Sequence, residues 1–168
     1  MITVRITKHY RTVSVDTARL RALVKAVCRR FEVREAVVSI GIVNDVEMAE
    51  FNMRFLRHEG TTDCMSFDLS DNREEAKLFD LIVNVERAAR EAARRGHSVD
   101  AELALYVTHG LLHNLGFDEA TPAQAGKMHR MEDEILQHQG MGWCIIPTPG
   151  RGEFPPRYLR ASWKGLGR

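Results

Sequence analysis

Apolar and polar residues alternate at the start of the chain, through residues 2–7 (ITVRIT). This period of two predicts a strand with one buried face. Residues 16–31 behave differently, because their apolar residues recur at helical spacing behind Asp16, a residue type that caps helices. The apolar, β-branched run at 37–43 then predicts a second strand. The first part of the chain therefore predicts two strands joined by a helix that covers one face of a sheet.

The next helix is marked by its cap. Asn44 and Glu47 have the spacing of a capping box, in which each side chain bonds the other residue's backbone N–H. Helical spacing after this cap turns Met48, Phe51 and Phe55 inward.

In the second half, short apolar runs at 64–67 and 81–83 predict strands, and capping residues and glycines bound three helices at 84–96, 98–116 and 121–138. The pattern as a whole predicts an α+β fold, with a small mixed sheet of about four strands and about five helices. We expect the helix at 98–116 to line a cleft.

Composition excludes several classes of protein. The chain has 168 residues, of which 44% are hydrophobic and 28% charged, as in ordinary globular domains. No apolar run approaches the roughly 20 residues that span a bilayer, and the N-terminus lacks the apolar region of a signal peptide. Cys28, Cys64 and Cys144 are too few and too widely spaced for a disulfide framework. We therefore expect a soluble, cytoplasmic protein that contacts no membrane.

Charge is balanced overall but not along the chain. With 24 Lys and Arg against 23 Asp and Glu, the net charge is +1, whereas residues 151–168 carry five basic residues and one glutamate. The last segment is also rich in Gly and Pro and has no clear periodicity. We interpret residues 1–140 as one domain and residues 141–168 as an irregular basic extension.

The chemically informative stretch is His109-x3-His113-x2-Gly116-x2-Glu119. Residues four apart lie on one face of a helix, so both imidazoles can reach one metal ion. Gly116 permits a sharp turn that brings Asp118 or Glu119 towards the same ion. The spacing resembles that of metzincin proteases, but their catalytic glutamate corresponds to Gly110 here, which disfavours peptide hydrolysis.

These residues resemble the YbeY family of metal-dependent, single-strand-specific endoribonucleases, which act in small-subunit ribosomal RNA maturation and ribosome quality control. Residues 109–119 match most of the family signature H-G-x-L-H-L-x-G-Y-D-H, with Phe117 in place of tyrosine. Residues 62–67 resemble the family's T-D-V-L-S-F strand, with Asn52 at the expected spacing before it. Met128-x3-Glu132 resembles its M-x3-E.

The resemblance implies one zinc ion per chain, held in the family by three histidines. His109 and His113 match two of them, and Glu119 stands at the position of the third. A carboxylate in this place is chemically sound, although its negative charge makes the ion a weaker Lewis acid. His129 is the alternative third ligand, and Asp118 is a candidate to orient one of the histidines.

Two further residues are expected at the catalytic site. The family arginine that faces the RNA phosphate falls at Leu56 here, and Arg57 beside it is the candidate replacement, with a solvated surface charge as the alternative. Ser66 is expected to hydrogen-bond the substrate, with a purely structural strand residue as the alternative.

The resemblance implies an enzyme in which a metal-activated water attacks an RNA phosphodiester. Its partners would be ribosomal RNA and the small ribosomal subunit, with no DNA substrate. Because Glu119 and Leu56 depart from the family pattern, one alternative is a ribosome-assembly or RNA-binding module that has lost efficient catalysis. The other is a metallohydrolase of a different substrate, including peptides.

Overall fold

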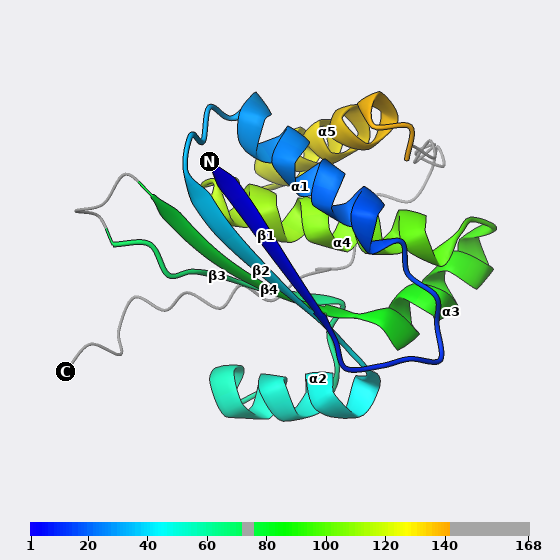
Figure 1. Cartoon of the computed structure of the whole chain (residues 1–168). Helices are drawn as coiled ribbons and strands as arrows, with labels where there is room; N and C mark the ends of the chain where they lie inside the picture. Colours follow the sequence, from blue (N-terminus) through cyan, green and yellow to red (C-terminus); the bar gives the residue numbers. More distant parts are fainter. Residues whose placement is uncertain (72–75, 142–168) are drawn as a thin grey trace.

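A four-stranded sheet forms the centre of the molecule in a computed structural model that describes residues 1–71 and 76–141 (Figure 1). The strands are β1 (Ile2–Lys8), β2 (Ala36–Val43), β3 (Cys64–Asp68) and β4 (Lys77–Asn84). Their spatial order is β1-β2-β4-β3. β1, β2 and β4 are parallel, whereas β3 pairs antiparallel with β4 and forms one edge. The predicted mixed sheet is confirmed.

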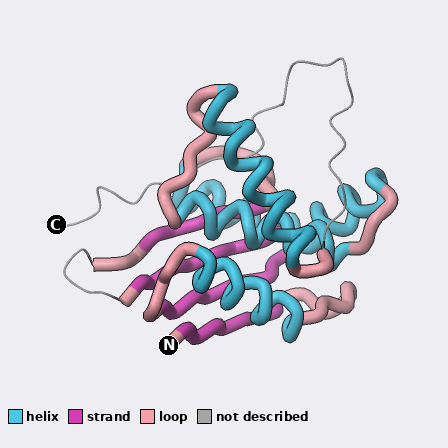
Figure 2. Tube along the Cα trace, turned by 90° about the horizontal axis from the view of Figure 1, so that it is seen from above, coloured by secondary structure: helices cyan, strands magenta, loops and turns pink. Residues whose placement is uncertain are grey.

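Five α-helices and one π-helical segment accompany the sheet within the described residues: α1 (Thr17–Arg30), α2 (Asp45–Phe51), η1 (Asn52–Leu56), α3 (Val85–Arg95), α4 (Val99–Asn114) and α5 (Pro122–His138). In Figure 1, α1, α4 and α5 lie on one face of the sheet and α2 lies on the other. Figure 2 shows the same layers from above, with the strands side by side beneath the helices. The predicted α+β fold is therefore confirmed.

The main core lies between the sheet and helices α1, α4 and α5, because buried and partly exposed residues alternate along the strands. On β2, Ala36, Val38, Ile40 and Ile42 are buried, and the residues between them are partly exposed. Helix α4 is buried on nearly all sides, and every residue from Glu102 to His113 is buried. A helix that is apolar all round belongs in the interior. Here it packs against α1, α3, α5, β3 and β4, so its residues are held from several directions.

The helix starts follow the predicted caps. Asn44 and Glu47 form a complete capping box, and so do Thr121 and Gln124. Ser98 caps α4, since its hydroxyl accepts from the Ala101 backbone N–H.

One predicted helix differs from the structure. The helix after Asn44 ends as an α-helix at Phe51 and continues as the π-helical segment η1. The wider turn breaks the 3.6-residue spacing. As a result Phe55 is 36% exposed rather than turned inward, and its ring stacks on Phe51 and meets Phe67 edge-on. The expectation of an inward Phe55 is wrong.

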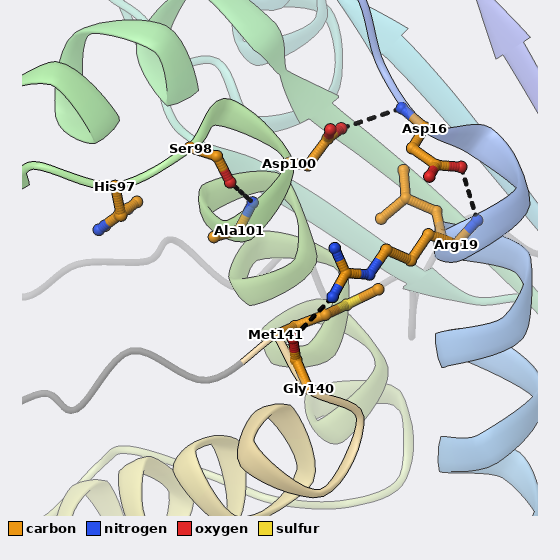
Figure 3. A pocket seen from close by; sticks show the side chains of 9 residues that line it. Asp16, Arg19, His97, Ser98, Asp100, Ala101, Gly140 and Met141 are labelled. Atoms are coloured by element: carbon orange, nitrogen blue, oxygen red, sulfur yellow. Dashed lines mark hydrogen bonds between the residues drawn. The ribbon is translucent and has the colours of Figure 1, made fainter.

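The starts of α1 and α4 and the end of α5 meet around a hollow of about 210 Å³ (Figure 3). The Asp16 backbone N–H donates to the Asp100 carboxylate at 3.0 Å, and Arg19 donates to the Gly140 carbonyl at 2.6 Å. These bonds join α1 to both other helices. His109, His113 and Glu119 are not among the residues that line this hollow.

In the two described stretches, no helix combines the length and apolarity needed to cross a membrane. Cys28 and Cys64 are buried free thiols. The predicted basic extension falls, from residue 142 onward, outside the described residues, as does Cys144.

Candidate metal centre

His109 and His113 lie one helical turn apart on α4, with their rings facing the same space. Their Nε2 atoms are 2.9 Å apart, and the two rings meet nearly at right angles, 4.5 Å between centroids. Both are buried, His109 at 1% exposure and His113 at 9%. The predicted chelating pair is thus present on one helix face.

The turn that follows α4 is built around Gly116, whose φ of +95° favours glycine. The Phe117 N–H donates to the Leu112 carbonyl at 2.9 Å and the Gly116 N–H donates to the His113 carbonyl at 3.0 Å. This pair of bonds is a Schellman motif, which ends a helix and reverses the chain. Asp118 then accepts a hydrogen bond from the Glu119 backbone N–H at 2.8 Å. The reversal returns Glu119 to the histidines.

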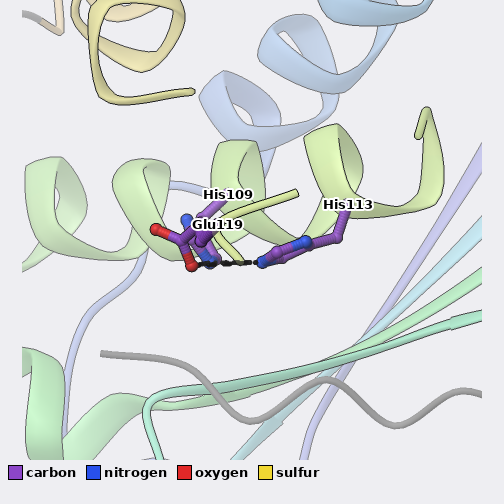
Figure 4. A group of neighbouring side chains, drawn as sticks. All are labelled: His109, His113 and Glu119. Atoms are coloured by element: carbon purple, nitrogen blue, oxygen red, sulfur yellow. Dashed lines mark hydrogen bonds and ion pairs between the residues drawn. The ribbon is translucent and has the colours of Figure 1, made fainter. Parts of the chain in front are cut away.

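The Glu119 side chain completes a compact triangle with the two imidazoles (Figure 4). Its Oε2 atom is 3.5 Å from Nε2 of His109 and 3.5 Å from Nε2 of His113. Ligand atoms around a tetrahedral zinc ion with bonds of roughly 2.0–2.1 Å are about 3.3 Å apart. The three residues therefore have the spacing of a metal-ligand set.

Hydrogen bonds on the far side of each ring determine which nitrogen faces this space. Nδ1 of His109 is 2.5 Å from the Glu132 carboxylate, and Nδ1 of His113 is 3.1 Å from the Phe117 carbonyl. Since both partners are acceptors, the Nδ1 of each ring carries a hydrogen, and the Nε2 of each ring faces the shared space. Two ring nitrogens and a carboxylate oxygen then converge, an arrangement that a divalent cation stabilises. The donor set fits a metal ion.

Electrostatics favour a neutral His109 and an ionised Glu132. Burial lowers the pKa of His109, and this effect outweighs the hydrogen bond that His109 donates to Glu132, which raises it. For Glu132, burial raises the pKa, but hydrogen bonds from His109 and His129 outweigh burial and hold the pKa below its ordinary value. A neutral His109 beside an ionised Glu132 is the arrangement that a metal-binding imidazole requires.

Arg57 and Ser66 are the two residues predicted to act on the substrate. Arg57 is exposed, with a left-handed backbone at φ +53° just after η1, while Leu56 packs partly buried against the apolar cluster under the sheet. Ser66 is 9% exposed on the edge strand β3, and its Cβ lies beside Gly110 of α4. Their expected catalytic roles stay predictions.

Two features of the centre were not assigned from the sequence. One is the Phe117 carbonyl, which no side-chain pattern could mark. The other is Glu132, whose match to the family's M-x3-E was noted but whose bond to His109 was not expected. That match to M-x3-E was the signal in the sequence that pointed to Glu132. His129, the alternative ligand, lies 3.7 Å from Glu119 and 3.1 Å from Glu132.

The mixed sheet, the His-x3-His helix and the carboxylate returned by the turn define an α+β protein with a three-ligand candidate metal centre. Three protein ligands with an open fourth position are typical of catalytic rather than structural zinc sites.

Known proteins similar to this chain belong to the family whose motifs the sequence resembles. The family model described as Endoribonuclease YbeY matches residues 5–140, and the chain belongs to this family. An Endoribonuclease YbeY from Desulfitobacterium hafniense is 35% identical over 130 residues, covering 72% of this chain and 83% of the relative. One from Carboxydothermus hydrogenoformans is 33% identical, covering 77% and 92%.

Among solved structures, the solution structure of TM1509 from Thermotoga maritima has a TM-score of 0.55 to this chain. It is 20% identical in sequence, and the similarity covers 81% of this chain and 91% of that protein. This likeness supports the fold.

Proposed function

We propose that the protein is a metal-dependent, single-strand-specific endoribonuclease that acts in small-subunit ribosomal RNA maturation and ribosome quality control. The observation that carries this proposal is the triangle of His109, His113 and Glu119, in a chain that belongs to an endoribonuclease family. The partners are ribosomal RNA and the small ribosomal subunit, and the location is the cytoplasm.

His109, His113 and Glu119 would hold one zinc ion per chain, since two imidazoles and one carboxylate are a known zinc ligand set. When bound, such an ion supplies a Lewis acid and lowers the pKa of water. Glu132 and the Phe117 carbonyl fix the two rings so that Nε2 of each faces the ion.

Arg57 is the residue proposed to neutralise charge on the phosphate. Leu56, at the position of the family arginine, is engaged in apolar packing, whereas its neighbour Arg57 is exposed. Ser66 is proposed to hydrogen-bond the substrate from the edge strand β3, where it lies beside the metal-binding helix.

Peptide hydrolysis is the alternative that the structure disfavours. A glutamate at position 110 would be needed to act as the general base of a metzincin-like protease. A Cβ at Gly110 would lie 2.8 Å from Leu81 and 2.9 Å from Cys64, so this position is filled by the sheet. The loss of efficient catalysis is favoured by Glu119, because a carboxylate ligand weakens the Lewis acid, and by Leu56, because an apolar residue stands at the position of the family arginine.

A substrate panel tests the proposal. The purified protein is incubated with single-stranded RNA, duplex RNA and casein, and its metal content is measured by elemental analysis. We expect one equivalent of metal and cleavage of the single strand alone, with both lost in His113→Ala because two remaining ligands bind far more weakly. Metal-loaded protein that binds RNA without cleaving it would identify an RNA-binding module, and casein cleavage would identify a protease.

A further inference from the structure

His129 on α5 closes a ring of side chains that begins and ends at the candidate metal centre. Its Nε2 lies 3.7 Å from Oε1 of Glu119, and its Nδ1 lies 3.1 Å from Oε2 of Glu132. The other oxygen of Glu132 contacts His109 at 2.5 Å, and the other oxygen of Glu119 lies 3.5 Å from His109. Each carboxylate therefore turns one oxygen to an imidazole of the centre and the other to His129.

We propose that His129 is a positioning residue that orients the Glu119 carboxylate for metal binding. The inference rests on the metal centre of the proposed function and adds a residue to it. Glu119 sits in the turn between α4 and α5 with a side chain that is 19% exposed, so its position is less restrained than that of either buried histidine. Ordering a glutamate side chain when metal binds has a cost in rotamer entropy, and a partner on a helix that restrains the side chain beforehand reduces this cost.

The geometry separates this role from that of a ligand. Only Glu119 Oε2 faces both histidine Nε2 atoms, at 3.5 Å each, while Nε2 of His129 faces the opposite oxygen. The second nitrogen of His129 is occupied by Glu132, one helical turn further along α5. His129 thus lies between a ligand and that ligand set's partner, with Nε2 facing Glu119 and Nδ1 facing Glu132.

The contribution of His129 depends on which residue stands at position 119. A carboxylate has two equivalent oxygens and rotates, so it gains from a group that restrains one of them. An imidazole at position 119 would have no oxygen for His129 to hold. His129 and Glu119 should therefore act as a pair, and the contribution of His129 to metal affinity should disappear in Glu119→His.

The test is a double-mutant cycle read out as zinc affinity, measured by competition with a chromophoric chelator on metal-free protein at one pH. His129→Asn keeps a donor near the Nδ1 position, towards Glu132, and loses the group that faces Glu119. His129→Gln keeps a donor near the Nε2 position. His129→Leu removes both. Circular dichroism checks that each variant is folded.

In the parent, we expect His129→Asn and His129→Leu to weaken zinc binding by about 10–100-fold and His129→Gln to restore most of the affinity. In the Glu119→His background, His129→Asn should change affinity less than about twofold. Unchanged affinity in the parent background, or an equal loss in both backgrounds, would overturn the inference. So would a greater loss from His129→Leu than from Glu119→Ala, because His129 would then be the ligand. RNA cleavage by the zinc-loaded parent reports on the proposed function separately.

Discussion

Glu119 is the residue at which the centre departs from three imidazoles. Glu119→Ala should release most of the metal, because it removes one of three ligands. Glu119→His should retain the metal and leave more positive charge on it, since a neutral ligand replaces an anion. The acid limb of the pH–rate profile for RNA cleavage should then shift to lower pH, with cleavage near neutral pH equal to or above that of the parent.

Elemental analysis of Glu119→Ala, Glu119→His and the parent measures whether Glu119 is the third metal ligand. This measurement does not depend on activity. Full metal occupancy in Glu119→Ala would make Glu119 a turn residue and move the third ligand to Asp118 or His129.

Gly110, between the two histidines of α4, lets the helix approach the sheet closely. An added Cβ would lie 2.8 Å from Leu81 and 2.9 Å from Cys64, both in the core. Gly110→Ala should therefore lower the free energy of unfolding by about 1–3 kcal/mol through overpacking, despite the better helix propensity of alanine. Chemical denaturation of metal-free protein measures this change.

Gly126 supplies a matched control on α5. There a Cβ would meet only the end of the flexible Arg130 side chain, at 3.4 Å. Gly126→Ala should be neutral or stabilise the protein by up to about 1 kcal/mol. Equal effects at both glycines would contradict the close approach of α4 to the sheet.

At the scale of single residues, the sequence predicts the parts of the centre that lie close together in the chain. His109 and His113 follow from helical spacing, and the glycine turn predicts Asp118 or Glu119 beside them. The resemblance to the YbeY family selects Glu119, which the structure places with the two histidines. The bonds from Glu132 and His129 join α5 to α4 across the fold. Spacing within one helix carries no information about such packing, so these contacts could not be predicted.

At the scale of elements, caps and periodicity predict the strands and helices well, and η1 is where they fail. The π-helical segment lies within the helix predicted after Asn44 and shifts the residues after Phe51 by part of a turn. The sequence carries an ordinary helical pattern there, so only the backbone geometry reveals why Phe55 is exposed and Leu56 packs under the sheet.

The end of η1 presents Arg57 with a left-handed backbone, φ +53°. Arg57→Asn removes the charge without adding strain, because asparagine tolerates this conformation. If Arg57 contacts a phosphate, the variant should bind single-stranded RNA more weakly at every sequence, with a salt dependence reduced by roughly one charge. Fluorescence anisotropy across a salt titration measures both.

The comparison variant is Arg94→Ala on α3, an exposed arginine paired with Glu91. It should bind RNA as the parent does. Equal losses for the two variants would indicate a general charge effect and contradict a specific role for Arg57.

At the scale of the whole molecule, the buried Asp63 makes stability depend on pH. Burial raises its pKa from 3.8 to about 6, against the opposing effects of Arg87 and of the hydrogen bond from the Cys64 N–H. A carboxyl whose pKa is raised on folding contributes stability that is present below its unfolded value and is lost as pH rises through about 6.

Asp63→Asn cannot ionise and should escape this loss. Relative to the parent, its free energy of unfolding should rise by up to about 3 kcal/mol between pH 4 and pH 7. Denaturation of both metal-free proteins across this pH range measures the difference in their free energies of unfolding. The contributions of the other titrating groups, which both proteins share, cancel in this difference. A difference that stays constant with pH would show that Asp63 is ionised throughout.

The overall architecture follows from the sequence because one element organises it. Helix α4 is mostly apolar and lies in the interior, and the other helices then cover its sides and the sheet. The family match over residues 5–140 agrees with the part of the chain that carries this pattern.

The central claim is that RNA cleavage depends on one metal ion held by His109, His113 and Glu119. The most direct measurement is a titration of metal-free protein with zinc, in which cleavage of an end-labelled single-stranded RNA is followed at each step. The account predicts no cleavage without metal, and a rise that saturates near one equivalent per chain in the parent and is absent from His113→Ala at the same zinc concentrations. Full cleavage by the metal-free protein, or by His113→Ala at one equivalent, would contradict it.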